Sequence, residues 1–203
     1  MNLSEQIDNH RGTPYLRVLI SYNHSKNILS SNAFELSVML EKLENHEIQQ
    51  KMGWDEFRKR FMDFDGHIVR YLHNFVTAVM TLREHTRVIM RSELMSEAHK
   101  ARYAAKVKET FDQSNLARFM QDFRRYYFHY GIPNVEHVTT ILPKENTEIF
   151  LDLTHLNQWK DWSASGHQFI QNHLPKIRLR ILVNDYLQMA MEFNQWFTLD
   201  MAQ

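Results

Sequence analysis

The sequence predicts an all-α protein, folded as an up-and-down helical bundle with a long central helix and a small β-hairpin or extended insertion before the C-terminal helix. Only 5 glycines and 4 prolines occur in 203 residues, which favours long helices and few turns. Apolar residues recur at three- and four-residue spacing along most of the chain, the period of one buried helical face. We expect one helical domain over residues 13–203, with the extended insertion at about 135–153, after a flexible polar segment over residues 1–12.

Two helices are expected ahead of the central one. The first begins near Pro14, because proline is well tolerated in the first turn of a helix. Residues 30–32, two serines and an asparagine, are good N-caps and predict the start of a second helix, which Gly53 ends. The apolar residues assigned to the buried sides of these helices are Leu16, Leu19, Ile20, Ile28, Phe34, Leu36, Val38, Met39, Leu40 and Leu43.

The strongest helical signal lies in the centre of the chain. It predicts one amphipathic helix from Trp54 or Asp55 to about Met95. Gly66 falls inside this helix at a cost of about 1 kcal/mol relative to alanine, which is too little to break it. The apolar residues that keep the three-and-four alternation are Phe57, Phe61, Phe64, Ile68, Leu72, Phe75, Val79, Leu82 and Ile89.

Two more helices are expected before the pattern changes, a short one over residues 97–110 and another over 114–130. Ser114 is a suitable N-cap for the second of these. Gly131 can take the left-handed conformation that closes a helix, and Pro133 prevents its continuation.

The C-terminal third begins with two short runs rich in β-branched residues, 136–142 and 147–153, separated by a polar turn. They predict a hairpin, or an extended loop, since an isolated hairpin is only marginally stable. Thr154 is expected to cap a short helix that reaches Trp159, and both Trp159 and Trp162 are expected in the core. A last long helix runs to near Met201, with a kink or break at Pro175.

Composition and motifs exclude several classes of function. The chain has no cysteine, which removes disulfides, thiol nucleophiles and cysteine-ligated zinc. Basic and acidic residues number 24 each, whereas a dedicated duplex-DNA-binding protein usually carries a basic excess. No apolar run is long enough for a membrane span and the N-terminus lacks a signal-peptide pattern, so a cytoplasmic protein with no membrane partner is expected.

No metal or cofactor is expected from the motifs. None of the 12 histidines is four residues from another, so the His-x-x-x-His zinc pattern does not occur. A glycine-rich phosphate loop and the Gly-x-Ser-x-Gly elbow of serine hydrolases are also missing.

The candidate site is the stretch over residues 119–133, "FMQDFRRYYFHYGIP", at the end of the predicted helix. Arg124 and His129 project about 140° apart on a helix, whereas Asp122, Arg125 and His129 follow one another at i, i+3 and i+7. A guanidinium near an imidazole can bind a phosphodiester and transfer its proton. This spacing is weak evidence alone, because Arg17 with His24 and Arg60 with His67 meet a similar rule.

The wider sequence frame resembles the HEPN superfamily. "FRRYYFHYGIP" is similar to the "LRNYxxHxGLP" segment of a group of uncharacterised bacterial HEPN-like proteins. "YLHNFVTAVMTLREHTR" (71–87) is similar to their "hNYlaSvktLvdHtR" helix, and "LNQWKDWSASGHQFI" (156–170) to their "LLkWdgWsakakkYi" stretch.

The resemblance implies a helical bundle that dimerises and brings two Arg/His motifs into one cleft, with RNA as substrate and an antitoxin or another protein as a further partner. It implies a metal-independent endoribonuclease of a defence or toxin–antitoxin type. In such an enzyme His129 acts as general acid or base and Arg124 stabilises the scissile phosphate, leaving a 2′,3′-cyclic phosphate. Arg125 stands where Asn, Asp or His is usual, and many family members are non-catalytic. A helical dimerisation or partner-binding module is therefore the alternative.

A second basic feature is a row at i, i+4 and i+8 on the central helix, formed by Arg83, Arg87 and Arg91. It predicts either an ordinary solvated face or a surface for RNA phosphates, together with the nearby residues Lys100, Arg102 and Lys106.

Overall fold

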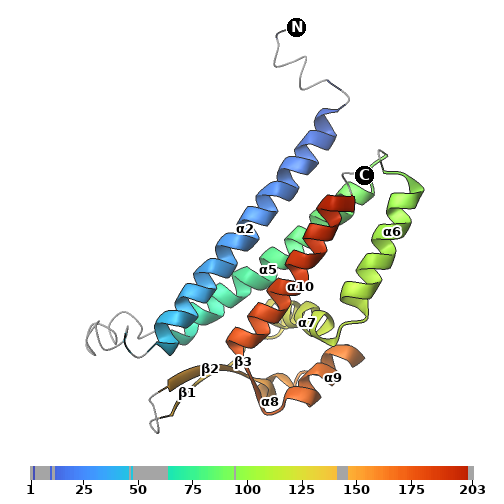
Figure 1. Cartoon of the computed structure of the whole chain (residues 1–203). Helices are drawn as coiled ribbons and strands as arrows, with labels where there is room; N and C mark the ends of the chain where they lie inside the picture. The colour runs from blue at the N-terminus through green and yellow to red at the C-terminus, as the bar shows by residue number, and fades with distance from the viewer. Residues whose placement is uncertain are drawn as a thin grey trace.

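The computed structural model describes residues 2, 10, 12–45, 47, 64–93, 95–140 and 146–200, except for the side chains of residues 64 and 65 (Figure 1). This part of the chain is mostly helical, with one small antiparallel sheet. The elements in chain order are α2 (Thr13–Glu44), α5 (Phe64–Met90), α6 (Glu97–Val107), the π-helical turn η1 (Lys108–Asp112), α7 (Asn115–His129), β1 (Val135–Thr140), β2 (Asn146–Asp152), α8 (Leu153–Leu156), α9 (Ala164–His173), β3 (Lys176–Arg178) and α10 (Leu179–Asp200).

Helix α2 is one uninterrupted helix, so the predicted break at residues 30–32 is wrong. Pro14 does lie in its first turn, as expected. The helix continues through the two serines and the asparagine because Leu29, Ala33 and Leu36 form one buried face across them. Packing of a continuous apolar face outweighs the modest helix propensity of serine and asparagine.

The buried side of α2 also differs from the prediction in its N-terminal half. Leu16, Leu19, Ile20 and Ile28 are exposed, and Phe34 is 69% exposed. The Leu-rich C-terminal half sets the rotation of the helix, and at 100° per residue this turns Leu16 and Phe34 away from the core. Tyr22 and Ser25 occupy the inner face instead, where Tyr22 donates a hydrogen bond of 3.2 Å to Asn194 of α10 and Ser25 contacts His85 of α5.

The central helix is confirmed over residues 64–90. The turns predicted before residue 64 lie outside the described residues. Most of the N-terminal segment 1–12 also lies outside them. The apolar stripe of the central helix is buried as predicted and packs against α2 on one side and α10 on another, with the ring of Phe75 at 6.2 Å from that of Tyr186. None of the helices described by the structure is both long enough and apolar enough to cross a membrane. The stripe residues that are buried are Ile68, Leu72, Phe75, Val79, Leu82 and Ile89.

Helix α7 begins as predicted, since the Ser114 hydroxyl accepts a hydrogen bond of 3.2 Å from the Ala117 amide. Its end differs, because Gly131 does not adopt a left-handed conformation. The amides of Tyr130 and Gly131 instead both donate to the Tyr126 carbonyl, at 2.9 and 3.1 Å, which closes the last turn without a left-handed residue. The short helix α6 is continued by the π-helical turn η1 up to the start of α7.

The predicted hairpin is confirmed, and it belongs to a three-stranded antiparallel sheet in the order β1–β2–β3. His137 of β1 lies opposite Ile149 of β2, and Leu151 of β2 lies opposite Ile177 of β3. Strand β3 was not predicted. It occupies the break at Pro175, which separates α9 from α10 as expected.

The short helix after β2 is capped by Asp152 and not by Thr154. The Asp152 carboxylate accepts a hydrogen bond of 3.1 Å from the His155 amide, whereas the Thr154 hydroxyl donates to the Pro175 carbonyl at 3.4 Å. Aspartate is the better cap here because its charged oxygen also interacts favourably with the start of the helix.

Candidate functional site at the end of helix α7

The inner face of α7 fixes the position of the predicted site. Phe119, Met120, Phe123 and Tyr126 are buried, and Phe119 stacks on Trp162 at 5.3 Å and on Phe169 of α9 at 4.6 Å between ring centres. Trp159 and Trp162 lie in the core, as predicted. Because aromatic packing immobilises one face of the helix, the opposite face presents its side chains in a defined orientation. The exposed residues of that face are Arg124, Arg125, Phe128 and His129.

Arg125 takes part in a contact that holds α7 to the start of α9. Its guanidinium lies 3.4 Å from the carboxylate of Asp122 and 5.7 Å from the centre of the Trp159 ring. Asp122 is only 5% exposed and also accepts a hydrogen bond of 2.8 Å from the Ser163 amide. A buried carboxylate requires such partners. Arg125 therefore helps to compensate the charge of Asp122, which links α7 to the start of α9.

Arg124 and His129 are both exposed and share Phe128 as a neighbour. The guanidinium of Arg124 lies 5.1 Å above the Phe128 ring centre, and the centre of the His129 ring is 6.4 Å from that of Phe128. Within the described part of the chain neither side chain hydrogen-bonds to an acidic residue or to the other. The two groups therefore flank one exposed aromatic ring without touching.

A groove of about 710 Å³, which is within the usual size range of ligand sites, is lined by Tyr127 of α7 but not by Arg124, Phe128 or His129. It lies between the first turns of α5 and the segment that leads from α7 into β1. The residues that line it are Gly66, Val69, Arg70, His73, Tyr127, Ile132, Pro133, Asn134, Val135, Glu136 and Asp152.

His73 connects the groove to the predicted site. Its ring centre lies 5.4 Å from that of Tyr127 and 5.4 Å from that of Phe128, so it brings a second imidazole next to the ring that Arg124 and His129 flank. One turn earlier on α5, Arg70 stacks on the neighbouring Tyr71 with 4.4 Å from its guanidinium carbon to the ring centre. Sequence reasoning missed both residues, because only the packing of α5 against α7 brings them to this place.

Tyr127 serves as a hydrogen-bond donor within the groove wall. Its hydroxyl donates to the Val69 carbonyl at 3.4 Å. Burial, with a smaller contribution from Tyr126, raises the pKa of Tyr127 far above its usual value. The phenol therefore keeps its proton, and it can orient a ligand but cannot act as a base at neutral pH.

Arg83 of the predicted basic row does not face solvent, because its side chain is only 7% exposed. Its guanidinium lies over the ring of Phe111 at 4.7 Å and 3.8 Å from the carboxylate of Asp112, which also pairs with Arg118 at 3.4 Å. Burial, followed by the charge of Arg87, lowers the pKa of Arg83.

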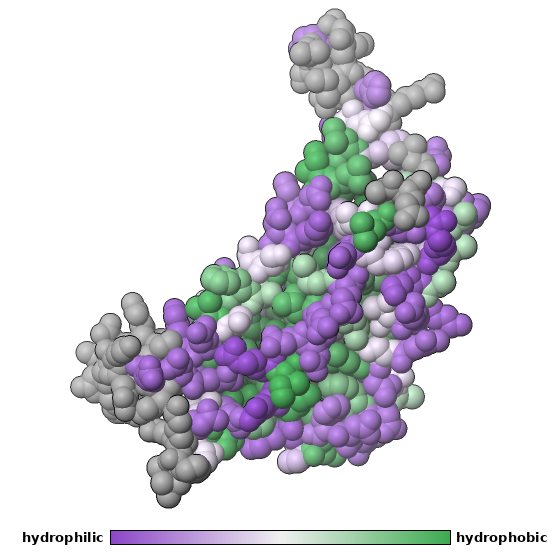
Figure 2. Space-filling model, viewed as in Figure 1, coloured by the Kyte–Doolittle hydropathy of each residue, from purple (hydrophilic) through white to green (hydrophobic). Residues whose placement is uncertain are grey.

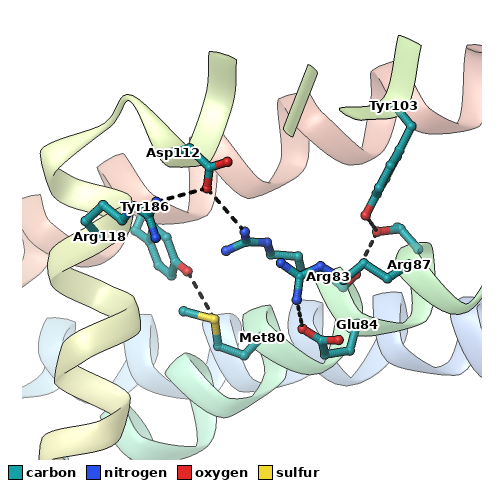
Figure 3. Close-up of polar contacts among 9 residues, drawn as sticks. Met80, Arg83, Glu84, Arg87, Tyr103, Asp112, Arg118 and Tyr186 are labelled. Atoms are coloured by element: carbon teal, nitrogen blue, oxygen red, sulfur yellow. Dashed lines mark hydrogen bonds and ion pairs between the residues drawn. The ribbon is translucent and has the colours of Figure 1, made fainter. Parts of the chain in front are cut away.

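The other members of this basic group mostly have acidic neighbours. Arg87 pairs with Glu84 (Figure 3). Contacts of 2.8 to 3.1 Å with a carboxylate are made by Lys100, Arg102 and Lys106. These pairs favour an ordinary solvated face over a phosphate-binding surface.

Across the residues that the structure describes, no three His, Asp or Glu side chains form a group able to hold a metal ion. No protein-family model matches this chain, and no curated protein or solved structure was found to be similar to it.

Proposed function

We propose that the end of α7 and the adjoining groove bind RNA phosphates, and that this site is that of a metal-independent endoribonuclease. The observation that carries the proposal is the gathering of Arg124, His129 and His73 around one exposed ring, Phe128. His73 also lines the adjoining groove, together with Arg70. The HEPN resemblance supports the same assignment for Arg124 and His129.

The chemistry requires one base, one acid and a cation, all of which this arrangement supplies. One imidazole removes the proton of a ribose 2′-hydroxyl, whose oxygen then attacks the neighbouring phosphorus atom. The bond from phosphorus to the 5′ oxygen breaks, and the second imidazole gives that oxygen a proton, leaving a 2′,3′-cyclic phosphate. Arg124 stabilises the negative charge that builds up on the phosphate oxygens. His129 and His73 are the two imidazoles.

Exposed aromatic and apolar residues beside the groove favour RNA over a small phosphate ligand. Phe128, Tyr130 and Ile132 are all exposed at this end of α7. Unpaired bases stack on such side chains, with about 1–3 kcal/mol per stacked base. Arginine next to an aromatic ring suits a ligand that alternates phosphates with bases.

The decisive experiment is RNA cleavage in the presence of a metal chelator. Wild-type protein should cleave, and Arg124→Ala, His129→Ala and His73→Ala should each reduce the rate by about 100-fold or more, the usual contribution of a general acid or base. Matched controls are Arg91→Ala and His167→Ala, which change exposed residues outside the site and should leave the rate unchanged. Cleavage that persists in all three site variants would remove these residues from the mechanism.

The second candidate is a non-catalytic helical module that dimerises or binds an antitoxin or another protein partner. It is favoured by Arg125, whose guanidinium pairs with the buried carboxylate of Asp122. Catalytic members of the HEPN superfamily are expected to have Asn, Asp or His at this position. Absence of cleavage by wild-type protein in the same assay would favour this alternative.

A further inference from the structure

The outward face of α2 carries apolar side chains that nothing within the described chain covers. Leu16, Leu19 and Ile20 form a cluster at its N-terminal end, and Figure 2 shows hydrophobic residues gathered over that end. Phe34, the second most exposed large hydrophobic residue described, lies on the same side nearer the C-terminal end, with the half-buried Val38 one turn further. Exposed apolar side chains that cluster on one face mark an interaction site more often than scattered single residues do.

These residues form one seam along the helix. Leu16, Ile20, Asn27, Phe34 and Val38 are spaced by four, seven, seven and four residues, which keeps them within about 40° of one another around the helix. They lie opposite the inner face that packs on the core. The positions between the two apolar ends are polar, namely Asn23, Asn27, Ser30 and Ser31. The seam therefore has two apolar ends and a polar centre.

We propose that a second copy of this chain docks on this face, with its α2 antiparallel to the first. Centred on Asn27, the pairing places Ile20 against the partner's Phe34, and Leu16 against the partner's Val38. Asn27 then meets the partner's Asn27, and the two side-chain amides can hydrogen-bond to each other. Each apolar end of one copy is covered by the opposite apolar end of the other.

The charges on α2 select the antiparallel arrangement and a partner identical to itself. Its N-terminal half contains Arg17, His24 and Lys26 and no acidic residue. Its C-terminal half contains Glu35, Glu41, Lys42 and Glu44, and it stays net negative although Glu44 pairs with Arg180 of α10. Antiparallel pairing sets the basic half against the acidic half at both ends, whereas parallel pairing sets like charges together. Arg17 and Glu35 also lie on the same flank of the seam, which suits contact between copies.

This inference does not depend on the proposed nuclease, because no residue that lines the groove belongs to α2. The two surfaces can be tested separately, and loss of one need not affect the other.

Association is tested first by sedimentation velocity across micromolar concentrations. Wild-type protein should dimerise, and Ile20→Lys should weaken dimerisation by at least about tenfold, since each dimer contains two copies of the change. The matched control is Ile181→Lys on α10, because Ile181 is 47% exposed and Ile20 is 44% exposed. Circular dichroism shows whether each variant retains its helices. A wild-type monomer at all concentrations, or equal weakening by both folded variants, would overturn the proposal.

The antiparallel orientation of the two α2 helices is tested by disulfide cross-linking. Only the introduced cysteines can react, because the chain has no cysteine of its own. A mixture of Leu16→Cys and Val38→Cys proteins should form a disulfide-linked heterodimer on oxidation. Leu16→Cys alone should not cross-link to itself, because antiparallel pairing holds its two copies at opposite ends of the interface. Efficient self-linking of Leu16→Cys without the mixed product would show a parallel pair and overturn the proposal.

Discussion

At the scale of single residues, Asp122 and Gly166 show how closely the middle of α7 is tied to α9. A Cβ atom at position 166 would lie only 2.6 Å from the Asp122 Oδ2. The same oxygen accepts the hydrogen bond from Ser163, so it cannot move away without losing that partner. Glycine is thus required by close approach, not by backbone conformation.

We predict that Gly166→Ala lowers the free energy of unfolding by about 1–3 kcal/mol, because the clash displaces a buried carboxylate. Urea denaturation followed by circular dichroism measures this. Gly131→Ala is the control, since its added Cβ would meet its nearest neighbour, the Tyr126 hydroxyl, at an ordinary 3.6 Å. An equal loss in both variants would show that the contact with Asp122 is not the cause.

Tyr186 provides a residue-scale prediction about pH. Burial raises its pKa above the ordinary value of 10.0, and the nearby Arg83 opposes this only in part (Figure 3). Above pH 10 the unfolded chain releases a proton that the folded chain keeps, so stability falls as pH rises. Between pH 9 and 11 the wild type should lose about 1.4 kcal/mol more than Tyr186→Phe. Denaturant titrations at pH 9, 10 and 11 test this, and parallel losses in both proteins would contradict it.

At the scale of elements, α2 carries two faces with opposite environments. Leu29 is buried against α5, whereas the adjacent Ile28 is exposed. Leu29→Ala should therefore lower the free energy of unfolding by about 2–5 kcal/mol, and Ile28→Ala by less than about 0.5 kcal/mol. Denaturation at low protein concentration, where self-association is minimal, compares the two. Equal losses would mean that α2 is rotated differently about its axis.

The elements differ in how far their sequence determines them. Ser114 caps the first turn of α7, so the start of that helix could be predicted from the sequence. Pro175 lacks the backbone N–H that a continuing helix needs, so the break before α10 could be predicted as well. Strand β3 has only three residues and forms through pairing with β2, a distant contact that leaves no local periodicity. Rotation of α2 was mispredicted because apolar residues occur on both of its faces.

At the scale of the whole molecule, the candidate site joins segments about fifty residues apart in sequence. Arg124 and His129 could be identified from the sequence of their own helix. The different directions of their side chains follow from the 100° rotation per residue of an α-helix. His73 could not, because its relation to Phe128 depends on how α5 and α7 pack. The predicted composite cleft between two chains stays a prediction, whereas the groove itself is lined by one chain.

Mixing two inactive variants separates a single-chain site from a composite one. If each site is formed by one chain, a mixture of Arg124→Ala and His129→Ala proteins should remain as inactive as either variant, because no chain in the mixture holds both residues. The measurement is the RNA cleavage rate after the mixture has exchanged subunits. Recovery of roughly a quarter or more of wild-type activity would instead show that residues of both chains share one cleft.

The two-faced character of α2 has a consequence for how the chain is made. N-terminal elements leave the ribosome first, at about 5–20 residues per second. Both apolar faces of α2 are therefore exposed until the residues of α5 follow. The antiparallel pairing proposed above would thus be able to begin while both copies are still being translated, before the inner face closes on α5.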